Sequence, residues 1–263
     1  MTSGSTPDSA APAVAGMTGS YHETSPVTSL RPHFLCAWRS ELAPDQAADV
    51  AVLPDGCADI LWTGDRLSVV GPDVVAARPQ LAPGARVLGL RFQPGAARGW
   101  LGVSLSELVG RRVELGALWG DGCAERVARR VRDAATPEAQ MLALQQALAD
   151  DAPRQEAPAS RAAALFRWLA AAPQTGGPSL EDRLAMSERS VRRFSHEHFG
   201  YGPKMLERIL RLQRFIGLLR GPADPPLAML AALAGYADQA HLSREVRALC
   251  GMTPSALREQ ARG

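Results

Sequence analysis

Two stretches near the C-terminal end carry hydrogen-bonding side chains at helical spacing. Arginine can donate two hydrogen bonds to the acceptors on a guanine edge, and glutamine pairs in a similar way with adenine. A helix with such side chains on its outer face fits the major groove of B-DNA, which is about 12 Å wide. The candidates are Arg189, Arg192, Arg193, Gln239, His241 and Arg244. Their chemistry predicts contacts with bases and with the flanking phosphates.

The surrounding pattern predicts the helices that would position these side chains. They span residues 180–185, 188–198, 203–220, 227–234, 239–250 and 254–261. Capping oxygens before a helix and glycines after it are typical of helix ends. Such residues are Ser187, Asp238 and Thr253 at helix starts, and Gly200, Gly235 and Gly251 at helix ends. The order predicts two helix-turn-helix units joined by one long helix.

Charge is divided unequally along the chain. Residues 160–263 hold 15 Arg and Lys against 9 Asp and Glu, while residues 1–159 hold 14 against 18. A basic half beside an acidic half is typical of a protein in which one domain meets nucleic acid. Lys204 is the only lysine, so the many arginines also reflect a compositional bias. A solvated helix face is therefore the alternative for Arg189, Arg192 and Arg193.

Two motifs in the basic half resemble the AraC/XylS family of transcription regulators. One is Leu233–Arg247 (LAGYADQAHLSREVR), which is followed by Gly251-Met-Thr-Pro254. The other is Met186–Arg193 (MSERSVRR), which is followed by Gly200-Tyr-Gly-Pro-Lys204. The resemblance covers about 180–258 and implies a double helix-turn-helix domain with one reader helix in each unit.

The resemblance also implies roles for single residues. The residues expected to contact bases or phosphates are Arg189, Ser190, Arg192 and Arg193 in the first unit, and Gln239, His241 and Arg244 in the second. Lys204 and the amides at the start of the long helix suit phosphate binding. Arg208 and Arg211 are weaker phosphate candidates.

The first unit departs from the family pattern. Glu181 stands where the family usually has a small apolar residue, and Thr175-Gly-Gly-Pro178 takes the place of the first turn of the supporting helix. This unit is therefore expected to be truncated or loosely packed. His196 and His198 lie two residues apart and point to different sides of a helix. They are expected to face solvent or to cap the helix rather than to bind a metal.

The N-terminal half shows short apolar runs broken by Pro, Gly and Asp, which is typical of antiparallel β structure. Strands are predicted at 33–38, 50–53, 58–62, 67–70 and 87–92. Pro54-Asp-Gly56 predicts a turn that would make 50–53 and 58–62 a hairpin. Leu53–Trp62, Gly71-Pro72 and Gly89–Gly95 resemble an uncharacterised β-rich domain found ahead of AraC-type modules. That resemblance implies a cupin-like barrel and supplies no ligand.

The predicted fold class is α+β, with a β-rich cupin-like barrel and trailing helices followed by an all-α double helix-turn-helix domain. We expect a disordered tail at 1–20, a sensor or dimerisation domain at 21–152, a linker at 153–160 and the DNA-binding domain at 161–263. No apolar run reaches 18 residues, and the first twenty residues lack the pattern of a signal peptide. A cytoplasmic, bacterial protein is expected.

Double-stranded operator DNA is the expected partner, and we expect no enzyme activity, cofactor, metal or membrane contact. A small-molecule effector, a homodimer and contact with RNA polymerase stay open. The alternative from another class rests on Asp55, Cys57 and Asp59, which alternate around the predicted turn. It would make the barrel an enzyme, or Cys57 a reactive acceptor in a repair-type domain. Turn chemistry and a buried cysteine explain the same residues more simply.

Overall fold

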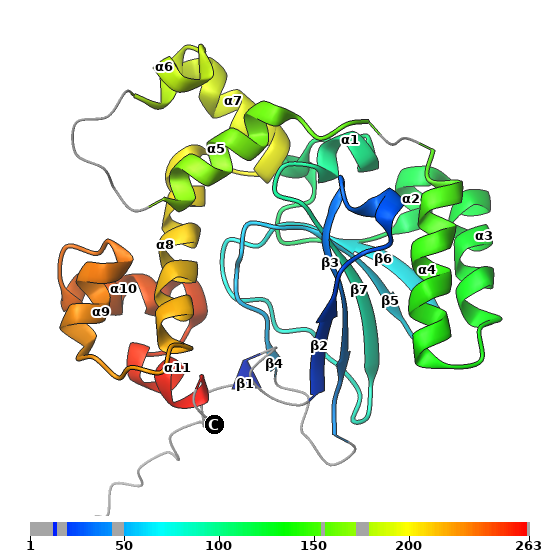
Figure 1. The fold of residues 1–263 in the computed structure, drawn as a ribbon, viewed down its shortest axis with the longest axis horizontal. Coiled ribbons are helices and arrows are strands. Elements are labelled where there is room, and N and C mark those ends of the chain that lie inside the picture. Colours follow the sequence, from blue (N-terminus) through cyan, green and yellow to red (C-terminus); the bar gives the residue numbers. More distant parts are fainter. Residues whose placement is uncertain (1–12, 15–19, 44–49, 154–155, 172–178, 262–263) are drawn as a thin grey trace, which may run out of the picture.

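A six-stranded antiparallel sheet, a two-stranded parallel sheet and a succession of helices make up the described part of the chain (Figure 1). The structure is a computed structural model and describes residues 13–14, 20–43, 50–153, 156–171 and 179–261. The predicted α+β class is confirmed, since the strands lie in the N-terminal part and helices follow them. No helix within the described ranges is long and apolar enough to cross a membrane.

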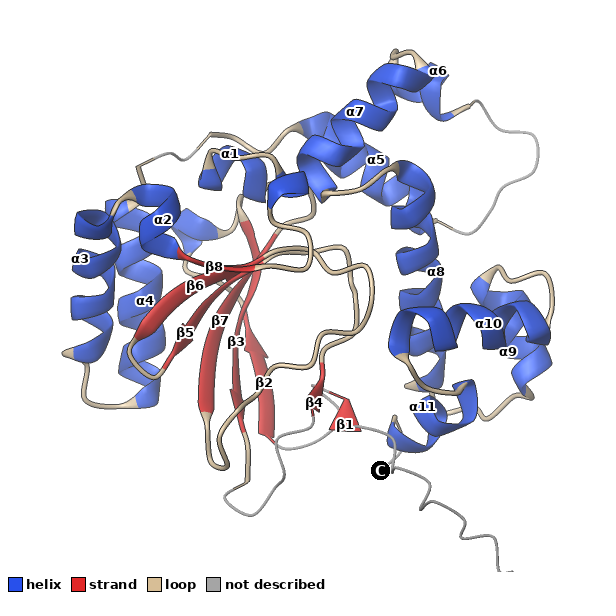
Figure 2. Cartoon of the chain, turned by 180° about the vertical axis from the view of Figure 1, so that it is seen from behind, coloured by secondary structure: helices blue, strands red, loops and turns tan. Residues whose placement is uncertain are grey.

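Six strands form the sheet, in the order β2-β3-β7-β5-β6-β8. The strands are β2 (Ser20–Thr24), β3 (Phe34–Glu41), β5 (Asp59–Thr63), β6 (Arg66–Val70), β7 (Arg86–Phe92) and β8 (Arg112–Glu114). The predicted barrel does not close in the described residues, because β2 pairs only with β3 and β8 only with β6. Helices cover one face of this open sheet and complete its core instead (Figure 2).

The predicted hairpin of 50–53 with 58–62 is wrong. Strand β4 (Val50–Ala51) pairs in parallel with β1 (Ala13–Val14), apart from the large sheet. Strand β5 pairs instead with β6 across Gly64, and with β7 on its other side. The Pro54-Asp-Gly56 stretch leaves the sheet to meet a helix of the C-terminal half, where the carbonyl oxygen of Pro54 accepts a hydrogen bond from Gln213 Nε2 at 2.8 Å. That long-range contact outweighs the local turn signal.

Side chains along β5 point alternately to the two faces of the sheet. Ile60 and Trp62 are buried against the helices, whereas Asp59, Leu61 and Thr63 point to the opposite side. The covering helices are α1 (Ala97–Leu101), α2 (Leu115–Trp119), α3 (Asp121–Arg132) and α4 (Pro137–Asp151). Short 3₁₀ turns lie at Thr28–Leu30 and Leu105–Glu107. Trp100 is fully buried at the centre, in edge contact with Phe34.

In the described residues of the C-terminal half, every regular element is a helix, as predicted. They are α5 (Ser160–Ala170), α6 (Leu180–Leu184), α7 (Glu188–Phe199), α8 (Pro203–Leu219), α9 (Leu227–Ala234), α10 (Gln239–Cys250) and α11 (Pro254–Gln260). The predicted caps are confirmed: Ser187, Asp238 and Thr253 each accept from a first-turn amide, and Gly200, Gly235 and Gly251 adopt positive φ.

Part of the predicted disordered tail is ordered structure. Ala13 and Val14 form β1, and the Val14 side chain is buried in the apolar cluster of the C-terminal helices. The Val14 amide donates to Gln260 Oε1 at 2.8 Å. A valine that finds an apolar partner far along the chain gives no local signal, so composition alone predicted coil. The remaining residues of 1–19 lie outside the described residues.

The two halves meet closely where α7 ends. Gly200 follows α7 with φ +85°, and a Cβ there would lie 2.5 Å from Val109 Cγ2 and 2.9 Å from Pro72 Cγ. Gly95 is equally confined, since its Cβ would lie 2.4 Å from Ala162 Cβ. Backbone of one half therefore packs directly against side chains of the other, and larger residues are excluded from both positions.

We predict that Gly200→Ala destabilises the protein through both strain and overpacking. A residue other than glycine in the left-handed backbone region lowers the free energy of unfolding by about 1–2 kcal/mol. Forcing a methyl group into a filled site lowers it by about 1–3 kcal/mol more. Gly110→Ala is the matched control, because Gly110 has φ +64° with open space around its Cβ position. Urea unfolding followed by circular dichroism measures both. Equal losses of unfolding free energy in the two variants would mean that the packing at Gly200 is loose.

Candidate nucleic-acid interface

The first helix-turn-helix unit is built from α6 and α7. Helix α6 has only five residues, in keeping with the expected truncation, and Ala185 at φ +50° turns the chain into α7. Ser187 caps α7, and its Oγ also donates to Ser190 Oγ at 3.0 Å. Val191 and Phe199 are buried beneath the helix. The opposite side of α7 therefore faces solvent.

The second unit, α9 with α10, follows the same plan with a longer supporting helix. Gly235 at φ +89° ends α9, and Asp238 Oδ1 accepts from the His241 amide at 2.6 Å to start α10. Leu242 and Val246 are fully buried on one side of α10. This packing aims Gln239 and Arg244 outward, where both are exposed.

Helix α8 joins the two units (Figure 1). Its two ends belong to different apolar cores. Leu206 and Ile209 pack in the core of the first unit, while Leu212 and Phe215 pack in the core of the second. A straight helix of this length spans about 25 Å. The spacing of the two reader helices is therefore set by one continuous backbone.

Arg214 ties neighbouring helix ends to the middle of α8. Its Nη1 donates to the carbonyl oxygens of Leu169, Ala170 and Ala171 at 3.3, 3.0 and 2.8 Å. Its Nε donates to the carbonyl oxygen of Ala234 at the end of α9. Terminal helix carbonyls lack partners within their own helices, and one guanidinium satisfies them at both α5 and α9. Arg214 is thus a structural residue that the sequence pattern did not single out.

The predicted DNA contacts that are exposed lie on the outer sides of the two reader helices and at the start of α8. They are Arg189, Arg192 and Arg193 on α7, Gln239 and Arg244 on α10, and Lys204 on α8. Within the part of the chain that the structure describes, Arg193 is the one of them with an ion pair, a weak one to Glu197 at 4.0 Å. Unpaired guanidinium groups keep all five N–H donors available.

Other predicted contacts are engaged in the protein. His241 Nδ1 accepts from the Ala237 amide at 3.4 Å, and its ring meets Tyr236 edge-on. Ser190 belongs to the Ser187 cap. Arg208 pairs with Glu245 at 2.9 Å, and Arg211 pairs with Glu207 and lies over the Tyr236 ring. Arg208 thus links α8 to α10, and Arg211 links α8 to the Tyr236 ring, while their contact with phosphate stays a prediction.

His198 differs from the expectation of a solvent or capping role. It is buried, and its Nδ1 lies 3.1 Å from the carbonyl oxygen of Gly95 in the N-terminal half. Burial lowers the pKa of this imidazole, so the neutral ring donates from Nδ1. The end of the first reader helix is therefore fastened to the N-terminal half. Only the tertiary structure could reveal this bond, because 103 residues separate its partners.

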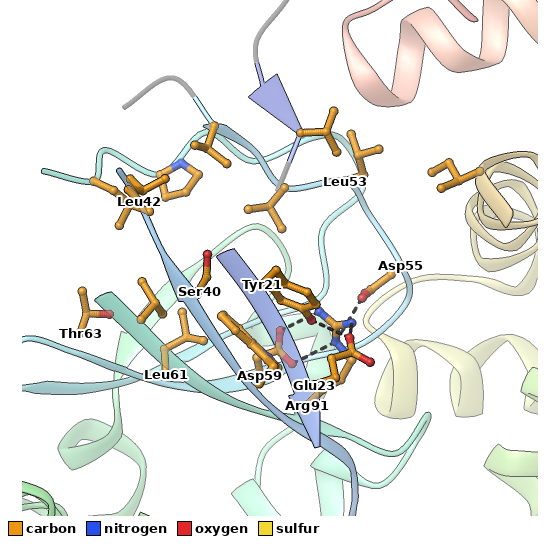
Figure 3. Close-up of a pocket in the computed structure, with 18 of the residues that line it drawn as sticks. Tyr21, Glu23, Ser40, Leu42, Leu53, Asp55, Asp59, Leu61, Thr63 and Arg91 are labelled. Atoms are coloured by element: carbon orange, nitrogen blue, oxygen red, sulfur yellow. Dashed lines mark hydrogen bonds and ion pairs between the residues drawn. The ribbon is translucent and has the colours of Figure 1, made fainter. Parts of the chain in front are cut away.

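A cavity of about 520 Å³ lies on the sheet face that the helices α1–α4 leave uncovered (Figure 3). Tyr21, Leu61 and Arg91 from the strands line one side of it. Gln213 and Ile216 from α8 line the other side. Both halves of the chain therefore form its wall. A second cavity, of about 700 Å³, shares Asp55, Arg91 and Gln213 with the first.

Arg91 is the centre of a charged cluster in this cavity, as the dashed lines of Figure 3 show. Its Nε lies 3.3 Å from Asp55 Oδ2 and 3.3 Å from Asp59 Oδ1, and its Nη1 lies 3.9 Å from Glu23. Tyr21 donates to Glu23 Oε1 at 2.6 Å. Asp55 and Asp59 were singled out in the sequence, but Arg91, Glu23 and Tyr21 were not, because pairing across β2, β3, β7 and β5 brings them together.

Cys57 lies beside this cluster and lacks the features of a reactive thiol. Burial raises the pKa of the Cys57 thiol well above its ordinary value, and the carboxylate of Asp55 adds to the increase. The thiolate is the nucleophilic form of cysteine, so a thiol that stays protonated does not favour the repair-type alternative. Among the described residues, no group of three or more His, Cys, Asp or Glu side chains could hold a metal ion.

We predict that Cys57 in the native protein is alkylated slowly. Because its pKa is raised, the thiolate population at pH 7–9 is smaller than for a free thiol. Mass spectrometry after timed iodoacetamide treatment measures the rate at Cys57, and the same chain unfolded in urea is the control. A native rate equal to or above the unfolded rate would restore the reactive-cysteine alternative.

Comparisons with known proteins agree with this geometry. Residues 180–260 match the family model of a helix-turn-helix domain. Residues 22–114 match a domain of unknown function (DUF6597). A search of curated proteins found no match.

Several solved structures resemble parts or most of the chain. A probable AraC family transcriptional regulator from Rhodopseudomonas palustris CGA009 is 23% identical, with a TM-score of 0.33, and covers 40% of this chain and 100% of its own. ToxT from Vibrio cholerae O395 is 9% identical, with a TM-score of 0.47, over 86% and 97% of the two chains. Unsaturated fatty acid bound ToxT from Vibrio cholerae strain SCE256 is 10% identical, with a TM-score of 0.44, over 87% and 95%.

Two capped reader helices with exposed arginines, held at the two ends of one spacer helix, define a DNA-binding protein of the double helix-turn-helix class. The family match covers both units together. The C-terminal part of the chain is an AraC-type helix-turn-helix domain, and the protein is a DNA-binding transcription regulator.

Proposed function

We propose that this regulator recognises a specific operator by placing α7 and α10 in neighbouring segments of the major groove. Successive major-groove segments on one side of B-DNA lie about 34 Å apart. The observation that carries the proposal is the exposed arginine-bearing side of each reader helix, with α8 as a common support. Both helices start at a well-formed cap, so their first turns are rigid enough to present side chains to base edges.

The role proposed for each DNA-contacting residue follows from the exposure of its side chain and from its partners in the protein. Arg192 and Arg244 are the main candidates for base reading, because they are exposed and no described carboxylate pairs with them. Further contacts to bases or phosphates come from Arg189, Arg193 and Gln239. Lys204, in the first turn of α8, contacts phosphate through its ammonium group. Ser190 and His241 stay in the proposal as phosphate contacts, since both remain partly exposed while they support the caps.

Gel-shift titration of the full chain with genomic fragments, including the region upstream of its own gene, tests the proposed function. We expect saturable binding to a small set of fragments with clear preference over random DNA at fixed salt concentration. Equal affinity for every fragment would overturn operator recognition and leave only electrostatic binding.

We predict that Arg192→Ala and Arg244→Ala each weaken operator binding by about 1–3 kcal/mol, because each removes a base-reading side chain. The loss should fall on specific DNA and leave binding to random DNA nearly unchanged. Arg129→Ala on α3 is the matched control, since Arg129 is an exposed arginine outside the DNA-binding half. If Arg244→Ala alone has an effect, the short first unit does not read bases.

We predict a different signature for Lys204→Ala. A phosphate contact contributes to affinity through counterion release, so its loss should weaken binding to all DNA sequences by the same factor. The slope of log K against log salt concentration should fall in magnitude by about 1. Fluorescence anisotropy over a range of salt concentrations, with operator and random DNA in parallel, measures the slope. An unchanged slope would remove Lys204 from the interface.

We also propose that the N-terminal half is a sensor, with the cavity between the sheet and α8 as its effector site. A ligand changes DNA affinity only if it binds DNA-competent and incompetent forms unequally, and a cavity wall shared by both halves offers that difference. A homodimer and contact with RNA polymerase fit a regulator of this type. Light scattering of the full chain tests the dimer.

A further inference from the structure

The cavity beside α8 has the size and lining of a small-molecule site. Its volume of about 520 Å³ falls within the range of roughly 300–1,000 Å³ that ligand pockets occupy. Apolar side chains from separate segments line the cavity, among them Leu42, Leu61, Leu81, Val87 and Ile216. Such a lining favours a ligand with an apolar body, because removing apolar surface from water is favourable.

The polar end of the same cavity carries an excess of negative charge. Three carboxylates, those of Glu23, Asp55 and Asp59, share the guanidinium of Arg91. The side chain of Asp59 is only 14% exposed, and burial raises its pKa. This accumulation of carboxylates is electrostatically costly while no further cation lies among them.

The other arginines of the cavity do not balance this end. Arg112 donates to Ser68 Oγ and Thr63 Oγ1, and Thr63 stands four residues beyond Asp59 on β5, or about 13 Å. Arg220 is exposed at the C-terminal end of α8. At the polar end, the N–H donors of Arg91 already point at the three carboxylates. An anionic ligand placed there would therefore be repelled by those carboxylates. A cationic group there would meet attraction instead.

Aromatic rings complete the acidic end. Tyr21 and Trp38 line the cavity with their ring centroids 5.8 Å apart. The faces of such rings attract cations through the ring quadrupole. We infer that the cavity is the binding site of an amphipathic organic cation, whose protonated amine lies among Glu23, Asp55 and Asp59 and whose apolar body lies along Leu61 and Val87 toward α8. The regulatory part of this inference rests on the proposed function.

The same residues connect the ligand to the DNA-binding half. Asp55 sits between Pro54, whose carbonyl oxygen accepts from Gln213 on α8, and Gly56, whose Cβ position lies 3.2 Å from Leu206. A bound amine competes with Arg91 for Asp55 and so acts on the segment that touches α8. Since α8 sets the spacing of the two reader helices, occupancy of the cavity changes affinity for the operator.

Calorimetric titration of the full chain at pH 7 with octylamine, octanol and octanoate tests the charge selection. These probes share one apolar chain and differ in charge, so wild-type protein alone decides the question. We expect octylamine to bind at least tenfold more tightly than octanol, and octanoate to bind most weakly. Equal binding of the three, tighter binding of octanoate, or no binding of any of them would overturn the inference.

A variant pair locates the amine. Glu23 is half exposed, so Glu23→Gln removes one charge with little risk to folding, and we expect about a fivefold to tenfold loss of octylamine affinity with octanol unaffected. Glu125→Gln, at an exposed carboxylate on α3 outside the cavity, is the matched control and should bind like wild type. An unchanged affinity in Glu23→Gln would place the amine elsewhere and overturn the assigned site.

Gel shifts with and without octylamine separate this inference from the proposed function. Selective DNA binding without amine binding would overturn the inference and leave the proposed function intact. Amine binding without selective DNA binding would overturn the proposed function and leave the ligand site standing. We expect both amine binding and selective DNA binding, with octylamine shifting the affinity for the operator and octanoate having no effect. Amine binding that leaves operator affinity unchanged would overturn the regulatory part.

Discussion

Helix α8 buries side chains along its whole length, and each part of that buried surface serves a different neighbour. Its first turns pack in the core of the α6–α7 unit, and its later turns pack in the core of the α9–α10 unit. Gln213 and Ile216 face the cavity above the sheet. A rigid helix cannot shift against one neighbour without straining the others, because cores are packed to near-crystalline density.

Two of the places where the N-terminal half contacts the DNA-binding half bear on α7 and α8. One is the close contact at Gly95, His198 and Gly200, where backbone meets side chains and a buried imidazole bonds a carbonyl. The other is the Pro54–Gln213 hydrogen bond, beside the charged cluster of Arg91. The first fastens the end of α7, and the second meets the middle of α8. Ligand binding in the cavity would act directly on the contact between Pro54 and Gln213.

Local signals were reliable where the physical cause is local. The caps of α7, α10 and α11 follow from a side-chain oxygen and an amide three residues on, and the positive φ of Gly200, Gly235 and Gly251 follows from the absent Cβ. Signals failed where a distant partner decided the outcome. The 50–62 segment resembles a hairpin, but Pro54 bonds to α8 and β4 pairs with β1.

The sequence by itself determined the two helix-turn-helix units, their order, and the polar side chains on the outer sides of α7 and α10, because helical periodicity and caps act over a few residues. Only the tertiary structure decided which polar side chains remain available and where a ligand can bind. Tyr21, Asp55, Arg91 and Gln213 are far apart in the chain, and strand pairing with interdomain packing brings them to one cavity. Charge and burial at that cavity depend on distances between segments, which no local pattern encodes.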